Sequence, residues 1–328
     1  MADPQVLCLG EVLFDKLADQ PGLPLDQVKS WTDYPGGAPA NVACALVKLG
    51  TPAAFVGCVG SDQTGDTLVE LLETIGVDLR GLQRHPTAPT RAVFVTRTEG
   101  GDRHFAGFGK YPTSEFADAF LSADTLPAEL FTHAQFLVMG TLELAYPETA
   151  EAVRRSLDLA EQHSLQVLMD VNWRPMFWDA PDTAPEIIRG LLDRVQYLKL
   201  SAEEADWLFE SRNPGAIAAQ LPQARGVLIT DGERGCTYSI AGHMGAVPAF
   251  PVDVEDTTGA GDAFLAGFLH QLCQQGETLF QTPEQTRECI TYASAVGALT
   301  TMRAGAIAAQ PDPREVEAFL YMHSLEEV

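Results

Sequence analysis

The sequence predicts an α/β fold: a doubly wound, mostly parallel sheet flanked by helices, with a small β lid. Three observations predict it. Short apolar runs typical of buried strands recur along the 328 residues, helical patterns lie between them, and one segment breaks the alternation with a hairpin pattern. The hydrophobic share of 46% and the length allow a substantial core.

Six apolar runs are predicted as buried strands, at 5–10, 53–60, 134–140, 165–170, 196–200 and 226–230. Helix patterns fall between them, at 39–49, 65–75, 147–163, 184–194 and 201–210. Two more helices, near 285–302 and 312–324, close the chain. Because strands that alternate with helices form a parallel sheet covered on both faces, this order favours the doubly wound architecture.

From Thr90 to Phe108 the pattern changes to two β-like runs around a Glu-Gly-Gly-Asp turn, which is a hairpin signal. The hairpin is either a decoration at the edge of the sheet or a lid over a ligand. Its polar and aromatic residues suit a ligand cover, namely Arg97, Arg103, Phe105 and Phe108. No internal repeat or long linker interrupts the chain, so we expect one domain over residues 1–328.

The composition excludes several kinds of function. A net charge of −24 argues against a nucleic-acid partner, because phosphate backbones bind basic surfaces. The six cysteines form no CxxC pair, which indicates buried thiols and neither a disulfide framework nor a zinc site. No apolar run approaches the ~20 residues that span a bilayer, and no signal peptide is recognisable. We therefore expect a soluble, cytoplasmic protein with no membrane partner.

Residues 256–264, DTTGAGDAF, bring glycines, a carboxylate and a helix start together. Gly259 and Gly261 let the backbone turn sharply and approach a ligand closely. Apolar residues at 264, 268 and 272 predict the helix that follows, and a helix N-terminus attracts anions such as phosphate. Asp262 in the first turn is either a participant in phosphoryl transfer or a helix cap.

A second glycine motif, GGAPAN at 36–41, also precedes a helix pattern. Pro39 suits the first helical turn, and Asn41 offers both a donor and an acceptor to a hydroxyl-rich ligand. Asp15, in GEVLFD at 10–15, is a further candidate, because a carboxylate accepts hydrogen bonds from neighbouring sugar hydroxyls. Taken alone, these positions favour helix-end hydrogen bonding for Asn41 and a solvated loop residue at a strand end for Asp15.

Together the motifs resemble those of the ribokinase-like carbohydrate kinases, also called the PfkB-type family, and within that family the chain is most similar to fructokinases. The resemblance runs from about residue 5 to residue 324. It is carried, in order, by GEVLFD (10–15), GGAPANVACALVKLG (36–50), VGSDQTGD (59–66), the hairpin, DVNWRP (170–175), LKLSAEEA (198–205), ITDGERG (229–235) and DTTGAGDAF (256–264).

The resemblance implies transfer of the γ-phosphoryl group of ATP to a sugar, D-fructose becoming fructose 6-phosphate. Asp262 would be the catalytic base, and the backbone N–H groups of Gly259, Ala260 and Gly261 would form the anion hole. The lid would comprise segments at about 12–35 and 89–112. The sugar would be held by Asp15, Gly36, Gly37 and Asn41, with Arg97 and Phe108 reaching it from the lid. The chain contains no GxxxxGK motif followed by Ser or Thr, so it is not a P-loop kinase.

The resemblance also implies contacts with ATP and Mg²⁺. Asn172 matches an Asn near the phosphates, and Glu204 matches an acid that binds Mg²⁺ through water, although Ser201 stands where many relatives carry Asn. Arg174 and Lys199 either contact phosphate or are surface charges. The nucleotide contacts implied are Asn172, Lys199, Ser201, Thr230, Gly232, Gly235, Gly259, Gly261, Ala293 and Gly297. A monovalent cation, K⁺, would bind mostly through backbone carbonyls at Asp256, Thr258, Thr300, Arg303, Gly305 and Ala309.

Three alternatives stay open at this point. A related kinase could act on ribose, 2-keto-3-deoxygluconate, a nucleoside or a sugar phosphate. A fructokinase-like protein without activity could serve as a regulatory module, although Asp262 and its glycines are intact. A nucleotide-binding dehydrogenase is disfavoured, because no GxGxxG follows the first strand. Lids of this family often form dimer contacts, so we expect a homodimer.

Overall fold

The computed structural model describes residues 3–98 and 103–326, and its main feature is a nine-stranded sheet in the order β13-β12-β11-β10-β9-β8-β1-β4-β5. In this order the strands from β5 to β11 run parallel, whereas β12 pairs antiparallel with β11 and β13 pairs antiparallel with β12. Their bounds are β1 Val6–Leu9, β4 Ala53–Gly60, β5 Asp78–His85, β8 Phe136–Met139, β9 Gln166–Asp170, β10 Tyr197–Ser201, β11 Gly226–Thr230, β12 Cys236–Ile240 and β13 His243–Val247.

The six predicted strands are confirmed as β1, β4, β8, β9, β10 and β11. Their side chains are almost all buried, which is why they stand out in the sequence as continuous apolar runs. The strands β5, β12 and β13 were not predicted. These strands lie at or next to the two edges of the sheet and carry polar residues between the apolar ones.

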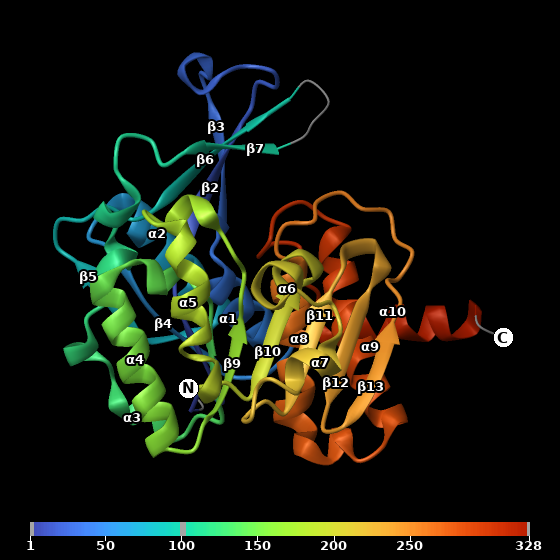
Figure 1. Cartoon of the computed structure of the whole chain (residues 1–328). Coiled ribbons are helices and arrows are strands. Elements are labelled where there is room, and N and C mark those ends of the chain that lie inside the picture. Colours follow the sequence, from blue (N-terminus) through green and yellow to red (C-terminus); the bar gives the residue numbers. More distant parts are fainter. Residues whose placement is uncertain (1–2, 99–102, 327–328) are drawn as a thin grey trace.

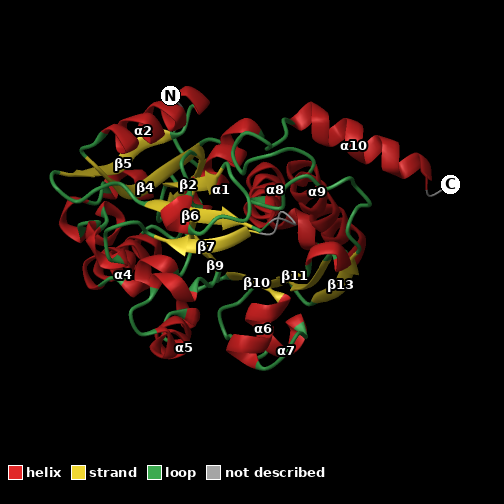
Figure 2. Cartoon of the chain, turned by 90° about the horizontal axis from the view of Figure 1, so that it is seen from above, coloured by secondary structure: helices red, strands yellow, loops and turns green. Residues whose placement is uncertain are grey.

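Helices cover both faces of the sheet, as predicted (Figures 1 and 2). One hydrophobic cluster joins the sheet to α1, α2, α8 and α9, and a second joins its other face to α4, α5, α6 and α7. The bounds are α1 Ala38–Lys48, α2 Gln63–Ile75, α3 Ala128–Phe131, α4 Pro147–Gln162, α5 Ala184–Arg189, α6 Ala202–Phe209, α7 Pro214–Ala218, α8 Ala260–Gln275, α9 Pro283–Thr301 and α10 Pro313–Glu326.

The predicted helix at 184–194 is wrong in its second half. Helix α5 ends at Arg189, where Gly190 is the C-cap, and residues 192–194 form a separate 3₁₀ turn. Glycine is a poor helix former, so the apolar spacing that continues past Gly190 does not extend the helix.

A second sheet of four strands, in the order β3-β2-β6-β7, stands away from the large one (Figure 1). It comprises β2 Leu13–Ala18, β3 Trp31–Gly36, β6 Ala92–Arg97 and β7 Arg103–Gly107. Strands β6 and β7 pair antiparallel, which confirms the hairpin, although its turn at 99–102 lies outside the described residues. The hairpin is therefore not an edge decoration of the large sheet. Both predicted lid segments, 12–35 and 89–112, contribute strands to this small sheet.

All six cysteines are free thiols; five are buried and Cys273 is partly buried. Within residues 3–98 and 103–326, no helix has the length and apolar character needed to cross a bilayer.

Candidate active site

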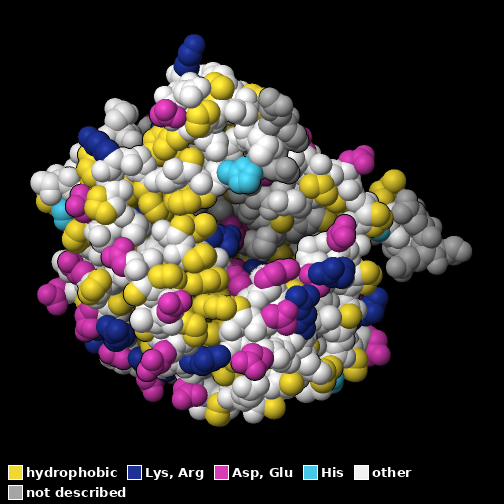
Figure 3. Space-filling view, turned by 45° about the horizontal axis from the view of Figure 1, so that its top comes forward, with side chains coloured by type: hydrophobic (Ala, Val, Ile, Leu, Met, Phe, Trp, Pro, Cys, Tyr) yellow, Lys and Arg dark blue, Asp and Glu magenta, His cyan; other side chains and the backbone are white. Residues whose placement is uncertain are grey.

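The candidate site is a cavity of about 750 Å³ between the small sheet, the carboxyl ends of β9, β10 and β11, and the N-terminus of α8. Figure 3 shows it as a hollow with charged side chains of both signs at its centre and hydrophobic ones along one side. The carboxyl ends of parallel strands are where doubly wound sheets bind ligands. Many residues predicted from the sequence line it, namely Asp15, Gly37, Asn41, Asn172, Lys199, Ser201, Glu204, Thr230, Asp256, Thr258, Gly259, Gly261, Asp262 and Gly305.

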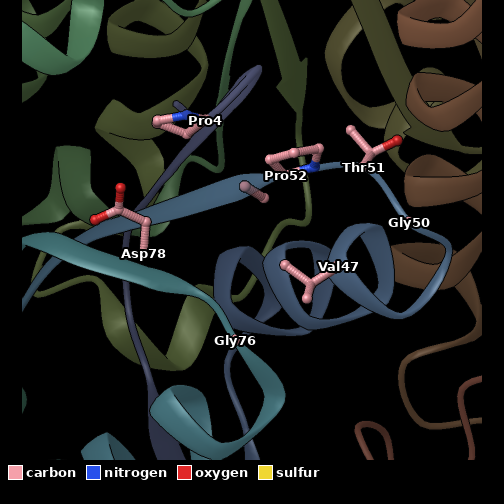
Figure 4. A pocket seen from close by; sticks show the side chains of 8 residues that line it. Pro4, Val47, Gly50, Thr51, Pro52, Gly76 and Asp78 are labelled. Atoms are coloured by element: carbon pink, nitrogen blue, oxygen red, sulfur yellow. The ribbon is translucent and has the colours of Figure 1, made fainter. Parts of the chain in front are cut away.

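A smaller cavity of about 230 Å³ lies at the opposite ends of the strands, where β4 and β5 begin (Figure 4). Its one charged lining residue, Asp78, is already paired with Arg80. The remaining lining residues are small or apolar apart from Thr51. This cavity presents no set of polar groups that converge on a ligand.

Asp262 lies in the first turn of α8, directly after the glycine turn that precedes the helix. Gly259 caps the helix with φ at 78°, and a Cβ there would come within 2.7 Å of Ala306, so the turn requires glycine. The Asp262 Oδ2 accepts a hydrogen bond of 2.8 Å from the Asn41 Nδ2. This contact joins the two glycine motifs across 221 residues of sequence.

The environment of Asp262 makes it a stronger base than a solvated aspartate. Burial raises its pKa, while the hydrogen bond from Asn41 and the charges of Lys199 and Arg174 oppose the rise. The net shift is upward, so the carboxylate gains affinity for a proton. The interpretation of Asp262 as a helix cap is not supported, because its side chain makes no capping hydrogen bond at α8.

Lys199 is a buried cation directly beside this turn. Its Nζ lies 2.6 Å from the Asp170 Oδ2, and both side chains are less than a tenth exposed. Burial acts to lower the pKa of Lys199, but the adjacent Asp170 outweighs it and the net pKa is raised, so the ammonium keeps its charge. A Cβ on Gly261 would lie 3.3 Å from the Nζ, which shows how closely the ammonium faces the α8 N-terminus. For Lys199 the surface-charge interpretation is wrong. Arg174 is exposed and also lines the cavity.

Ser201 and Glu204 form a capping box at the start of α6. The Ser201 Oγ accepts a hydrogen bond from the Glu204 backbone N–H at 3.1 Å, and one carboxylate oxygen of Glu204 accepts one from the Ser201 N–H at 2.7 Å. The other oxygen accepts from the Trp173 N–H at 2.6 Å. Glu204 is buried, and its carboxylate ties the loop after β9 to α6. Its predicted water-mediated contact with Mg²⁺ stays a prediction.

Replacing Glu204 with Ala should lower the free energy of unfolding by about 1–3 kcal/mol, because two buried backbone N–H groups lose their acceptor. Urea denaturation would measure the change. Glu203→Ala is the matched control, since Glu203 is the exposed neighbour on the same turn. Equal stabilities of the two variants would contradict the role of Glu204.

Asp256 joins the loop before α8 to the loop after α9. Its Oδ1 accepts hydrogen bonds from the Thr258 N–H and hydroxyl, and its Oδ2 accepts one from the Gly305 N–H at 3.0 Å. Of the other residues predicted for K⁺, the Thr300 hydroxyl donates to the Val296 carbonyl, and Arg303 pairs with Glu315. Thr300, Arg303 and Ala309 do not line the cavity. The predicted site rests on backbone carbonyls and stays a prediction.

The predicted sugar residues lie at the lid end of the cavity. Asp15 belongs to β2 and pairs in register with Tyr34 of β3 and Val93 of β6, so it lies on a strand and its interpretation as a solvated loop residue is wrong. Gly37 has φ at 104°, and its Cβ would lie 2.5 Å from the Glu11 carbonyl oxygen, so a side chain has no room there. Gly36 does not line the cavity, but it packs against the Asp15 carboxylate.

Two lid residues predicted to touch the sugar do not line the cavity. The Arg97 guanidinium donates to the backbone carbonyls of Ala18 and Asp19. Phe108 packs edge-on against Phe177 instead. Two aromatic lid residues do line the cavity, Tyr34 of β3 and Phe105 of β7. An apolar underside of the small sheet lines it as well, formed by Leu13, Leu17, Val93 and Val95. The side chain of Arg103 lies outside the described residues.

Four residues predicted to contact the nucleotide also lie away from the cavity. Ala293 is fully buried, and Gly297 packs closely against Ala260, so both belong to the contact between α9 and α8. Gly232 and Gly235 lie between β11 and β12, and Gly235 packs against the Val247 carbonyl. None of the four lines the cavity. Two lining carboxylates, Glu11 and Asp170, were missed; each is an acid in an apolar run, a signal that could have found them.

The nine-stranded, mostly parallel sheet and the separate four-stranded sheet define a class: this is a ribokinase-like α/β protein, and its sequence has no P-loop motif. Comparisons agree. The chain is 34% identical over 318 residues to "Probable fructokinase-3" of Arabidopsis thaliana, covering 96% of this chain and 91% of the relative. The solved structure of a fructokinase with bound ATP from Xylella fastidiosa superposes with a TM-score of 0.88 at 32% identity, covering 97% of this chain and 98% of the other.

A fructokinase from Vibrio cholerae, solved in fructose, ADP and calcium ion bound form, gives a TM-score of 0.82 at 27% identity over 98% of this chain and all of the other. Residues 3–313 match the model of the pfkB family carbohydrate kinases. The chain belongs to that family.

Proposed function

We propose that this protein transfers the γ-phosphoryl group of ATP to D-fructose, forming fructose 6-phosphate. The observation that carries the proposal is the Asp262 carboxylate, which lies beside the α8 N-terminus, hydrogen-bonded to Asn41, in a cavity roofed by the small sheet. This arrangement provides a base for a hydroxyl group and a pole of positive potential for the phosphoryl group. Asn41 and Asp15 would orient the sugar.

The anion hole would stabilise charge that develops on the transferred phosphoryl group. It comprises the backbone N–H groups of Gly259, Ala260 and Gly261 at the start of α8, with the Lys199 ammonium close by. ATP as donor is supported by the Xylella fastidiosa relative, which was solved with ATP bound. The apolar underside of the small sheet would exclude water, which otherwise competes for the phosphoryl group.

The cavity also fits Mg²⁺. The Oδ1 of Asp170 is buried and has no hydrogen-bond partner among the described residues, and carboxylate oxygens are the ligands that Mg²⁺ prefers. Asp170 and Glu204 would hold the ion, Glu204 through water, and the ion would neutralise phosphate charge when ATP binds.

We propose that residues 1–328 work as one kinase domain, because the cavity takes lining residues from both ends of the chain. The small sheet projects from the body (Figure 1), which suits the predicted homodimer contact. A sugar-phosphate kinase needs several cations to hold the first phosphate. Among the described lining residues, Arg174 and Lys199 are the cations, and Lys199 is engaged by Asp170, which favours an uncharged sugar.

A coupled assay across a panel of sugars tests the substrate. We expect D-fructose to give the highest kcat/KM among fructose, ribose, 2-keto-3-deoxygluconate, a nucleoside and fructose 6-phosphate, measured with and without K⁺. A faster reaction with another acceptor would replace fructose in the proposal. Saturable ATP binding without phosphorylation of any acceptor would instead indicate a regulatory module.

A further inference from the structure

Two buried carboxyl groups meet beneath the first turn of α1. Glu11 lies between β1 and β2, lines the cavity and is 5% exposed. Glu143 follows β8, does not line the cavity and is 2% exposed. Neither residue has a role in the reaction proposed above, and burying two ionised carboxylates together would be costly.

The hydrogen bonds around the pair are unequal. One oxygen of Glu11 accepts a bond of 2.8 Å from the Ala38 backbone N–H, at the start of α1. No N–H or O–H group of the described residues donates to either oxygen of Glu143. The two carboxyl groups nevertheless lie within hydrogen-bonding reach of each other. Because an ionised carboxylate only accepts hydrogen bonds, this contact requires a proton on one of them.

Among the described residues, the positive charge near the pair is already matched by another carboxylate. The charged groups that face the pair are Asp118 and Arg91, which form an ion pair of their own at 2.5 Å. Burial raises the pKa of Glu11, and burial together with the charge of Glu11 raises that of Glu143 well above its usual range. The positive end of α1 favours a single negative charge on Glu11.

We propose that Glu11 and Glu143 share one proton at neutral pH, and that this protonated pair positions the first turn of α1 for sugar binding. The inference rests on the proposed function. Both are positioning residues: Glu11 holds Ala38, which lies between Gly37 and Asn41 in the glycine motif. The Glu143 carboxyl lies next to the same turn, because both it and Pro39 border the position that a Cβ on Gly10 would occupy. Loss of the proton would place two like charges in contact and loosen this anchor.

Infrared spectroscopy of the whole protein reads the proton directly. We expect the carbonyl stretch of a protonated carboxylic acid at pH 7, assigned by its loss in Glu143→Gln. Glu11→Gln should remove the same band, because a glutamine at either position supplies the donor and leaves the partner ionised. Glu148→Gln, an exposed glutamate on α4, is the matched control and should retain the band.

Thermal melting against pH gives a second readout that does not depend on activity. A carboxyl group with a raised pKa binds more protons in the folded state than in the unfolded state, so its contribution to stability is lost as pH rises above about 4.5 toward the folded pKa. The Tm of the wild type should therefore fall relative to that of Glu143→Gln as the pH is raised from about 5 to about 9. The Tm of Glu148→Gln should change with pH as that of the wild type does.

Kinetics separate positioning from a general loss of structure. As the pair ionises at alkaline pH, KM for the sugar should rise about tenfold, the effect of one pKa unit of differential interaction, while KM for ATP stays constant. In Glu143→Gln the KM for the sugar should not change with pH. An infrared band and a melting profile identical in wild type and Glu143→Gln would overturn the shared proton. If no sugar is phosphorylated at all, the proposed function fails. The infrared and melting results still show whether Glu11 and Glu143 share a proton.

Discussion

Asp262→Asn should lower kcat by at least about a hundredfold, the usual size of the loss of a general base. The asparagine keeps the shape of the side chain and can still contact Asn41, so binding of ATP should be retained. Steady-state kinetics with the preferred sugar, together with equilibrium titration of ATP, would separate the two effects. In the wild type the raised pKa of Asp262 predicts that kcat/KM falls on the acid side as the carboxylate is protonated.

The matched control for Asp262→Asn is Asp253→Asn, the same substitution at an exposed position of the loop before α8. It should leave both kcat and the acid limb of the pH profile unchanged. Near-normal turnover of Asp262→Asn would contradict the assignment of the base. Loss of ATP binding in parallel with turnover would instead show that Asp262 acts on the fold of the anion hole.

The central strands were predictable because they are buried on both faces, which leaves continuous apolar runs such as 53–60 and 226–230 in the sequence. The strands β2 and β3 of the small sheet were not recognised as strands. In β3, TDYP is a polar stretch that ends in a proline, and only three residues separate β2 from β1. A sheet that covers a cavity needs apolar residues only on its underside, so its sequence signal is weak.

The anion turn and Asp262 were predictable because glycine spacing and a helix start carry local physical meaning. The meeting of Asp262 with Asn41 could not be read locally, since it joins residues that are 221 positions apart. Arg97 was misplaced because a strand pattern gives the side of a sheet but not the path of a long side chain. Phe108 was misplaced because it lies just past the end of β7, where the alternation of the strand no longer applies. The burial of Lys199 was missed for a related reason: its partner Asp170 lies on the neighbouring strand.

Lys199→Met should produce two separable losses. The Asp170 carboxylate would remain buried without its partner, or take up a proton, and breaking a buried pair in this way costs about 3–5 kcal/mol. Turnover should fall by about 10²–10³-fold if the ammonium acts like a donor of the anion hole. Urea denaturation would measure the first loss, and kcat at saturating ATP the second.

The double variant Lys199→Met with Asp170→Asn distinguishes structure from catalysis. Removing both charges of a buried pair is often close to neutral, so most of the free energy of unfolding should return. Turnover should not return, because the double variant lacks both the positive charge beside the α8 N-terminus and the Asp170 carboxylate that is proposed to hold Mg²⁺. If stability and turnover recovered together, Lys199 would serve only to neutralise Asp170, and stabilisation of the phosphoryl group would rest on the backbone N–H groups of the glycine turn alone.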